Sequence, residues 1–135
     1  MPDKKNLEFF VDEWVNHAVD DELNIRSILK HRDGTPANVC FLSQQMSEKY
    51  LKALILHYTG DYPKTHILDE LAAILHKHIP NLTENLKEDI ILLNDYYVGT
   101  RYPADIPLES FTWQQAEQAY KATTRIKEFV LEKLK

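Results

Sequence analysis

The sequence predicts an all-α protein, an antiparallel bundle of four long helices with one short extra helix. Apolar side chains recur at helical spacing through most of the chain. Its three glycines and six prolines lie between these periodic segments, and no segment shows the alternation typical of a strand. Because the connections between the long segments are brief, consecutive helices are expected to run antiparallel.

Length and composition set the class of protein. The 135 residues predict a single domain covering 1–135, and 44% apolar residues are enough for one packed core. No apolar run approaches the ~18–20 residues of a membrane helix, and the polar start is unlike a secretory signal. With Cys40 as the only cysteine, a cytoplasmic protein is expected. The net charge of −5 argues against nonspecific nucleic-acid binding by the monomer.

The first two helices have clear boundaries. The first is predicted over residues 7–31 and the second over residues 36–58. Thr35 is the expected N-cap of the second helix, with Pro36 at its first position. Gly60 is placed to end it.

The remaining helices are predicted from capping residues and prolines. Thr65 is the expected N-cap of a short third helix over residues 66–78, which a proline then stops. A fourth helix, capped by Asn81 or Thr83, is predicted to run to about residue 99. A proline-containing loop over 101–110 follows. Thr112 and Gln115 then form a capping box that opens the last helix.

The second helix carries a short polar strip on an otherwise apolar surface. At about 100° per residue the strip comprises Gln45, Glu48, Lys49 and Lys52. Phe41 and Leu56 lie on the same arc, one near each end. The helix is therefore expected to be enclosed on most sides, with the strip facing a cleft or a partner, and the apolar ends of the strip predict a dimer.

Three segments of the sequence together resemble the HEPN family. Residues 44–53, Gln-Gln-Met-Ser-Glu-Lys-Tyr-Leu-Lys-Ala, are similar to its second-helix signature, and residues 63–68, Pro-Lys-Thr-His-Ile-Leu, to its Thr-His-x-Leu turn. Residues 96–103, Tyr-Tyr-Val-Gly-Thr-Arg-Tyr-Pro, are similar to its tyrosine-rich helix end. Ala18 and Asp21 add the family's Ala-x-x-Asp spacing, although Glu22 stands where leucine is usual.

The resemblance implies an up-and-down four-helix bundle with a short extra helix, usually a homodimer. Prokaryotic members often act with a small nucleotidyltransferase as a toxin–antitoxin pair. The implied function is a nucleotide- or RNA-binding component of such a pair. No cofactor is implied. A purely structural interaction module is a further alternative.

Some HEPN proteins are metal-independent ribonucleases with arginine, four to six residues, then histidine. Arg26 and His31 match that spacing, but at the end of the first helix rather than in the C-terminal half. Neither Arg101 nor Arg125 is followed by histidine at the required distance. In the ribonuclease alternative, His31 would take the 2′-hydroxyl proton and Arg26 would stabilise the phosphorane charge. Whether the chain is an enzyme stays open.

A phosphate site is the leading candidate for a functional surface. It comprises Lys49, Lys52, His66 and Arg101, with Tyr97 or Tyr102 as a platform for a base. The ends of the second and fourth helices and the start of the third are expected to meet at one pole of the bundle. Lysine supplies a point charge there, and arginine a bidentate contact to phosphate.

Each of these residues also has a structural interpretation. Glu48 and Lys52 are spaced i,i+4 and form a helix-surface pair in that interpretation. His66 then fixes the turn, and Arg101 reaches Asp95 or Asp21. The tyrosines belong to the core.

No metal site is predicted. His76 and His78 are two residues apart and diverge on a helix, whereas a zinc pair on a helix needs i,i+4 spacing. Cys40 matches no protease signature and is expected to be a small buried hydrophobic residue.

Overall fold

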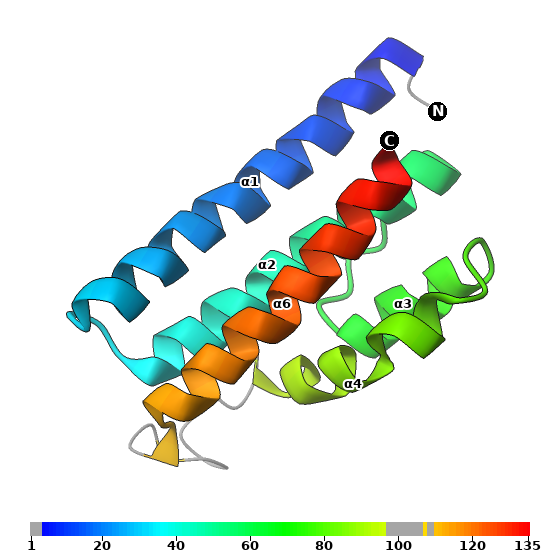
Figure 1. The fold of residues 1–135 in the computed structure, drawn as a ribbon. Helices are drawn as coiled ribbons and strands as arrows, with labels where there is room; N and C mark the ends of the chain where they lie inside the picture. Colours follow the sequence, from blue (N-terminus) through cyan, green and yellow to red (C-terminus); the bar gives the residue numbers. More distant parts are fainter. Residues whose placement is uncertain (1–3, 97–106, 108–109) are drawn as a thin grey trace.

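The computed structural model describes residues 4–96, 107 and 110–135, and in these residues the only regular elements longer than a turn are helices. The helices are α1 (Lys4–His31), α2 (Pro36–Thr59), α3 (Leu68–His76), α4 (Leu82–Asn94) and α6 (Trp113–Leu134). The long helices α1, α2, α4 and α6 alternate in direction along the chain, as Figure 1 shows. The predicted up-and-down four-helix bundle is confirmed, with α3 as the short extra helix.

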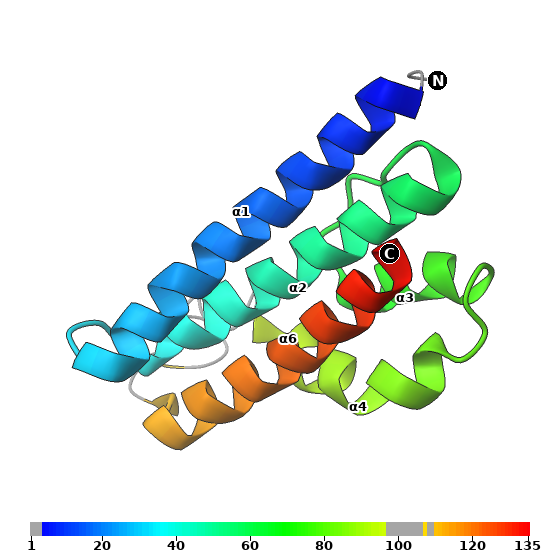
Figure 2. The same ribbon diagram turned by 45° about the horizontal axis from the view of Figure 1, so that its top comes forward.

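Helix α2 lies at the centre of the bundle. Figure 2 shows α1 and α6 on either side of α2. Helices α3 and α4 pair with one another on the side of the bundle away from α1. Of its 24 residues 15 are buried, so the prediction that it is enclosed on most sides is confirmed. The ends of the chain meet at one pole, where Leu7 and Leu134 pack against Val11 and Leu56.

The boundaries of α2 follow the sequence signals. The side chain of Thr35 accepts a hydrogen bond from the Asn38 N–H, and Pro36 occupies the first turn. Gly60 takes a left-handed conformation with φ 80°, and its N–H donates to the Leu56 carbonyl. At the last helix the capping box of Thr112 and Gln115 is present as predicted.

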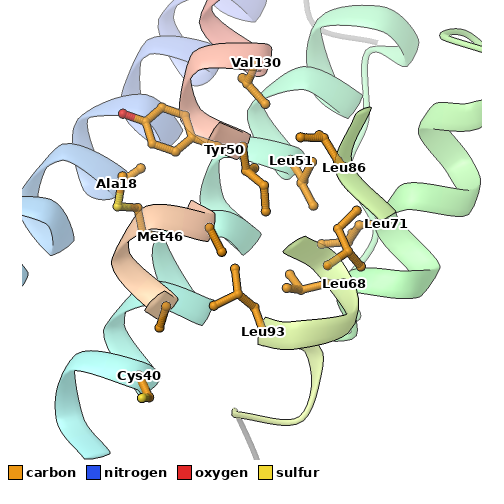
Figure 3. Packing of buried hydrophobic residues seen from close by; sticks show 14 of the residues in the cluster. Ala18, Cys40, Met46, Tyr50, Leu51, Leu68, Leu71, Leu86, Leu93 and Val130 are labelled. Atoms are coloured by element: carbon orange, nitrogen blue, oxygen red, sulfur yellow. The ribbon is translucent and has the colours of Figure 1, made fainter. Parts of the chain in front are cut away.

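The core joins all the helices around α2 (Figure 3). Tyr50 and Leu51 of α2 belong to one cluster with Leu71 of α3, Leu93 of α4 and Val130 of α6, and all five are fully buried. Each large side chain buried in this way contributes about 1.5–3 kcal/mol of transfer free energy.

Cys40 belongs to this core as expected, with no exposed surface. Burial raises the pKa of its thiol to about 12. Tyr96, at the end of the described segment after α4, lies against it.

The third and fourth helices differ from the prediction at their ends. Helix α3 begins at Leu68 rather than at residue 66, and its N-cap is Ile67, not Thr65. The Thr65 hydroxyl instead donates to the Glu70 carboxylate and accepts from the Ile67 N–H, so it closes a turn ahead of the helix. Helix α4 ends at Asn94, and residues 97–99, to which it was predicted to extend, lie outside the described residues.

Candidate functional site

The polar strip of α2 faces α1 and the segment between α2 and α3. Its centre is the Glu48 carboxylate, whose side chain is only 6% exposed. Lys52 Nζ donates to Glu48 Oε2 at 3.0 Å, and His66 Nδ1 lies 3.0 Å and 3.2 Å from the two carboxylate oxygens. Gln44 Nε2 donates to the His66 carbonyl at 3.1 Å. Gln44 and Glu48 of the 44–53 segment therefore hold His66, and with it the 60–67 connection, against α2.

Lys52 is held inside the protein. Its side chain is 4% exposed, and its Nζ lies 5.4 Å from the centre of the Trp14 ring on α1. A buried ammonium group requires a counter-charge, which Glu48 supplies. The pair with i,i+4 spacing is thus present, and the Lys52 charge is neutralised where it lies.

Lys49 points to α1 and pairs with a second carboxylate. Its Nζ lies 2.7 Å from Asp21 Oδ2, and the Asp21 side chain is 10% exposed. Burial raises the pKa of Asp21, and the hydrogen bond and charge of Lys49 offset this only in part, so the pKa stays above its usual value of 3.8.

A groove of about 600 Å³ lies beside this strip, between α1 and α2, with residues 60–62 at its end. Three aromatic side chains line it: Phe10, Trp14 and Tyr62. The Trp14 and Tyr62 rings meet edge to face, with their centroids 5.0 Å apart. We refer to this feature as the α1–α2 groove.

The polar groups of the α1–α2 groove are of both signs. Lys49 and His17 line it together with Glu13 and Asp61. The Asp61 carboxylate accepts a hydrogen bond from the backbone N–H of Tyr62 at 2.8 Å, which constrains the backbone that carries the Tyr62 ring. Apolar walls with a few oriented polar groups are typical of small-molecule sites.

The aromatic residues of the groove escaped the sequence analysis. Trp14 is one of the apolar residues that recur at helical spacing in the first helix, and this pattern alone does not distinguish a core position from a groove position. The available signal was its spacing, since Phe10, Trp14, His17 and Asp21 follow one another at i, i+4, i+7 and i+11 and so share one face of α1.

Leu56 does not mark an exposed end of the polar strip, and that part of the dimer argument was wrong. It is 4% exposed and packs against Val11 and Ala53, because the first turns of α1 cover it. Phe41, at the other end of the strip, is half-buried.

The predicted meeting of helix ends at one pole was also wrong. The 60–67 connection runs back along the bundle before α3 begins, so the ends of α2 and α4 lie at opposite poles (Figure 1). Tyr96, just after α4, contacts Cys40 near the beginning of α2. Tyr97, Arg101 and Tyr102 lie outside the described residues.

Arg26 and His31 are both exposed on α1. Five residues on a helix correspond to about 140° of rotation and about 7.5 Å along the axis, so their side chains leave on different faces. Arg26 lies beside Lys30 and Tyr120 in a separate groove between α1 and α6, whereas His31 is the last residue of α1.

Among the described residues no cluster of three His, Cys, Asp or Glu side chains is suited to a metal ion. His76 Nδ1 lies 3.3 Å from the Thr83 hydroxyl, while the His78 ring stacks on Tyr58. Within the same residues, no helix is long and apolar enough to cross a membrane.

Comparisons with known proteins agree with this architecture. The model of the HEPN domain matches residues 11–134. The crystal structure of TT1696 from Thermus thermophilus is similar, with 31% sequence identity and a TM-score of 0.81 over 91% of this chain and 97% of that one. The structure of ST0689, an archaeal HEPN homologue, has 26% identity and a TM-score of 0.72 over 93% and 98%.

No curated protein sequence matches the chain. The family match nevertheless spans nearly its whole length, and TT1696 is covered almost completely. The resemblance found in the signature segments is confirmed: the chain belongs to the HEPN family.

Proposed function

We propose that this HEPN protein binds a nucleotide in the α1–α2 groove and acts with a small nucleotidyltransferase, as one component of a toxin–antitoxin pair. The observation that carries the binding site is the set of aromatic side chains around Lys49, namely Phe10, Trp14 and Tyr62. Aromatic faces stack on any base, and the stacking is worth about 1–3 kcal/mol.

The polar groups of the groove suit a nucleoside with a short phosphate. The Glu13 and Asp61 carboxylates accept hydrogen bonds from ribose hydroxyls or from a base amino group. Lys49 and His17 are the groups that face a phosphate. Lys52, which the sequence analysis placed in the phosphate site, does not line the groove, but it contacts the Trp14 ring that does.

The test is isothermal titration calorimetry with AMP, GMP, CMP and UMP in turn. Tyr62→Ala removes an aromatic wall of the groove, and Tyr58→Ala is its matched control, because the two tyrosines are 43% and 39% exposed and Tyr58 lies outside the groove. We expect Tyr62→Ala to weaken binding about tenfold, which corresponds to ~1.4 kcal/mol. The Tyr58→Ala variant should bind like wild type.

Equal binding by both folded variants would place the site elsewhere. If no nucleotide binds, even with the nucleotidyltransferase present, the strip of α2 is structural and the protein is an interaction module. That interpretation is favoured by the carboxylate partners that Lys49 and Lys52 already have.

A homodimer is part of the proposal. Large apolar side chains are exposed on α1 and α4, among them Phe9 at 59%, Leu23 at 60% and Ile91 at 58%, and we propose that a second copy of the chain covers part of this surface. Light scattering at micromolar concentration should give about twice the 15.8 kDa chain mass. A clean monomer at high concentration would refute the dimer.

The ribonuclease alternative is tested separately. Because Arg26 and His31 leave α1 on different faces, one chain does not direct both at the same phosphate. We expect His31→Ala to leave any metal-free RNA cleavage unchanged. Loss of wild-type cleavage in this variant, with its helix content intact, would favour the ribonuclease.

A further inference from the structure

The ion pairs of the α1–α2 groove leave it with a negative charge. Besides His17, the charged side chains that line it are Glu13, Lys49 and Asp61. Lys49 Nζ lies 2.7 Å from a carboxylate oxygen of Asp21, so its charge is neutralised within the protein. Among the described residues, no lysine, arginine or histidine nitrogen lies within 4.0 Å of the Glu13 or Asp61 carboxylate. The groove therefore attracts a cation, in keeping with the net charge of −5.

The aromatic rings of the groove are also suited to a cation. The Trp14 and Tyr62 rings meet at 72° with their centroids 5.0 Å apart, so their faces form the two sides of a corner, and Phe10 supplies the third ring. The face of an aromatic ring attracts an ammonium group through its quadrupole. One such contact is already present, because Lys52 Nζ lies 5.4 Å from the centre of the Trp14 ring. Rings and carboxylates in one groove are suited to an organic ammonium ion.

The cation-binding groups come from two parts of the chain. Phe10, Glu13 and Trp14 are spaced i, i+3 and i+4 and share one face of α1. Asp61 and Tyr62 belong to the connection that follows α2. Each part thus supplies one carboxylate and at least one ring. Two carboxylates provide positions for two ammonium groups, and the rings provide apolar surface for a chain between them.

We propose that the α1–α2 groove binds an aliphatic diamine or polyamine, with one ammonium group on Glu13, a second on Asp61 and the methylene chain against the aromatic rings. Charge-assisted hydrogen bonds hold the ammonium groups, and removal of the methylene groups from water adds to binding. This inference goes beyond the proposed function and does not rest on it, because the ligand has the opposite charge to a nucleotide. Since both ligands need the same rings, binding of one excludes the other.

The first test is isothermal titration calorimetry of wild type with putrescine, cadaverine and spermidine, without nucleotide, at neutral pH and physiological ionic strength. The controls n-butylamine and n-pentylamine have the chains of the two diamines but only one ammonium group. Magnesium chloride supplies a divalent cation without a methylene chain. We expect at least one diamine or polyamine to bind about tenfold or more tightly than either monoamine and than Mg²⁺.

The second test removes the two carboxylates. Glu13→Gln/Asp61→Asn keeps side-chain size and an acceptor oxygen at both positions. Its matched control is Glu88→Gln/Asp33→Asn, which removes the same charges from one exposed helical position and one exposed loop position outside the groove. We expect the groove variant to bind the amine about tenfold or more weakly than wild type. The control variant should stay within about twofold, and circular dichroism checks the fold of both.

The third test examines the rings with two adjacent phenylalanines. Phe10 lines the groove and Phe9 does not, although the two side chains are 49% and 59% exposed. Leucine keeps an apolar side chain but has no ring face, so Phe10→Leu should weaken amine binding about threefold through the lost cation–π contact. Phe9→Leu should bind like wild type. Because both positions are exposed, this pair reports on the groove even if the double carboxylate variant fails to fold.

Four results would overturn the proposal. The first is no binding of any diamine or polyamine by wild type at millimolar concentration. The second is equal affinity for a diamine and for the monoamine of the same chain, because one carboxylate would then suffice. The third is displacement of the amine by an equal concentration of Mg²⁺, which would be an effect of charge alone. The last is equal weakening by the variants of the groove and their matched controls.

Discussion

Nδ1 of His66 lies 3.0 Å from the carboxylate oxygen of Glu48 that also accepts the hydrogen bond of Lys52. The glutamate of the helix signature and the histidine of the turn, 18 residues apart in sequence, therefore form one cluster. Because Gln44 also binds the His66 carbonyl, two contacts fix the backbone that returns from the end of α2 to the start of α3. The wall of the α1–α2 groove depends on the same cluster, since Lys52 lies against Trp14.

Loss of the Glu48 charge should destabilise the fold. In Glu48→Gln the buried Lys52 ammonium, 4% exposed, lacks a counter-charge, and breaking a buried pair in this way typically costs about 3–5 kcal/mol. Urea denaturation should show this loss. Glu117→Gln is the control, because its pair with Arg32 is exposed and should cost about 0–1 kcal/mol. Similar losses in both variants would mean that the Glu48 cluster contributes no more than a surface pair.

Glu22 should make the protein sensitive to acid. Burial raises the pKa of Glu22, but the hydrogen bonds from Lys127 and Tyr120 and the charges of Lys127 and Arg26 outweigh burial, so the pKa lies below its usual 4.5. A carboxyl with a lowered folded-state pKa adds stability above the unfolded pKa. This stability is lost as the pH falls from about 4.5 through the folded pKa.

The measurement is the free energy of unfolding of wild type and Glu22→Gln between pH 7 and pH 3. Wild type should lose stability below about pH 4.5, and the variant should lose less over the same interval. An identical slope in the two proteins would show that Glu22 does not contribute to the acid response.

The contribution of Asp21 to stability should change with pH in the opposite direction to that of Glu22. Burial raises its pKa above 3.8 despite Lys49, so the folded state binds the proton more tightly than the unfolded state. The contribution of this group to stability then falls as the pH rises from 3.8 through the folded pKa, and it is lowest at neutral pH. Asp21→Asn should therefore be as stable as wild type or more stable at pH 7. A loss above about 1 kcal/mol in thermal or urea unfolding would contradict this.

The helix boundaries that local chemistry sets were predictable. Thr35 and Gly60 bound α2, and the Thr112–Gln115 box opens α6, because each signal acts within one turn. At α3 the prediction was wrong because the Thr65 hydroxyl bonds within a preceding turn instead of capping the helix. Propensity alone does not distinguish these two uses of threonine.

The candidate site was predictable only in part, because its partners are distant in sequence. The polar strip of α2 was found from its periodicity, but the carboxylate that pairs with Lys49 is 28 residues away, on α1. Leu56 was placed on the polar arc of the second helix by its periodicity, but its coverage by Val11 depends on the packing of α1. The direction of the 60–67 connection, which separates the ends of α2 and α4, likewise depends on tertiary contacts.

Arg125 and Asp89 should hold α4 against α6. Arg125 Nε lies 3.0 Å from both Asp89 oxygens, and Nη2 lies 2.7 Å from Oδ1, which is a bidentate pair. Arg125→Lys keeps the positive charge but loses the bidentate hydrogen bonds of the guanidinium group. The substitution should lower the free energy of unfolding by about 1 kcal/mol, an amount limited by the 56% exposure of the arginine. Arg26→Lys, at an exposed position without such a pair, is the control for urea unfolding. Equal stability of Arg125→Lys and wild type would show that the bidentate hydrogen bonds add nothing beyond the attraction of the two charges.

The Cys40 thiol should be inert in the folded protein. It has no exposed surface, and burial raises the pKa of the thiol to about 12, so the reactive thiolate is almost absent at pH 8. Reaction with Ellman's reagent should therefore require unfolding, and its rate should rise with urea in parallel with the loss of helical circular dichroism. As a control, Ser27→Cys in the Cys40→Ala background places a thiol at an exposed position of α1 and should react at once without urea. Rapid reaction of Cys40 in the native protein would mean that the beginning of α2 opens locally, without global unfolding. The packing around Tyr96 would then be less stable than the rest of the core.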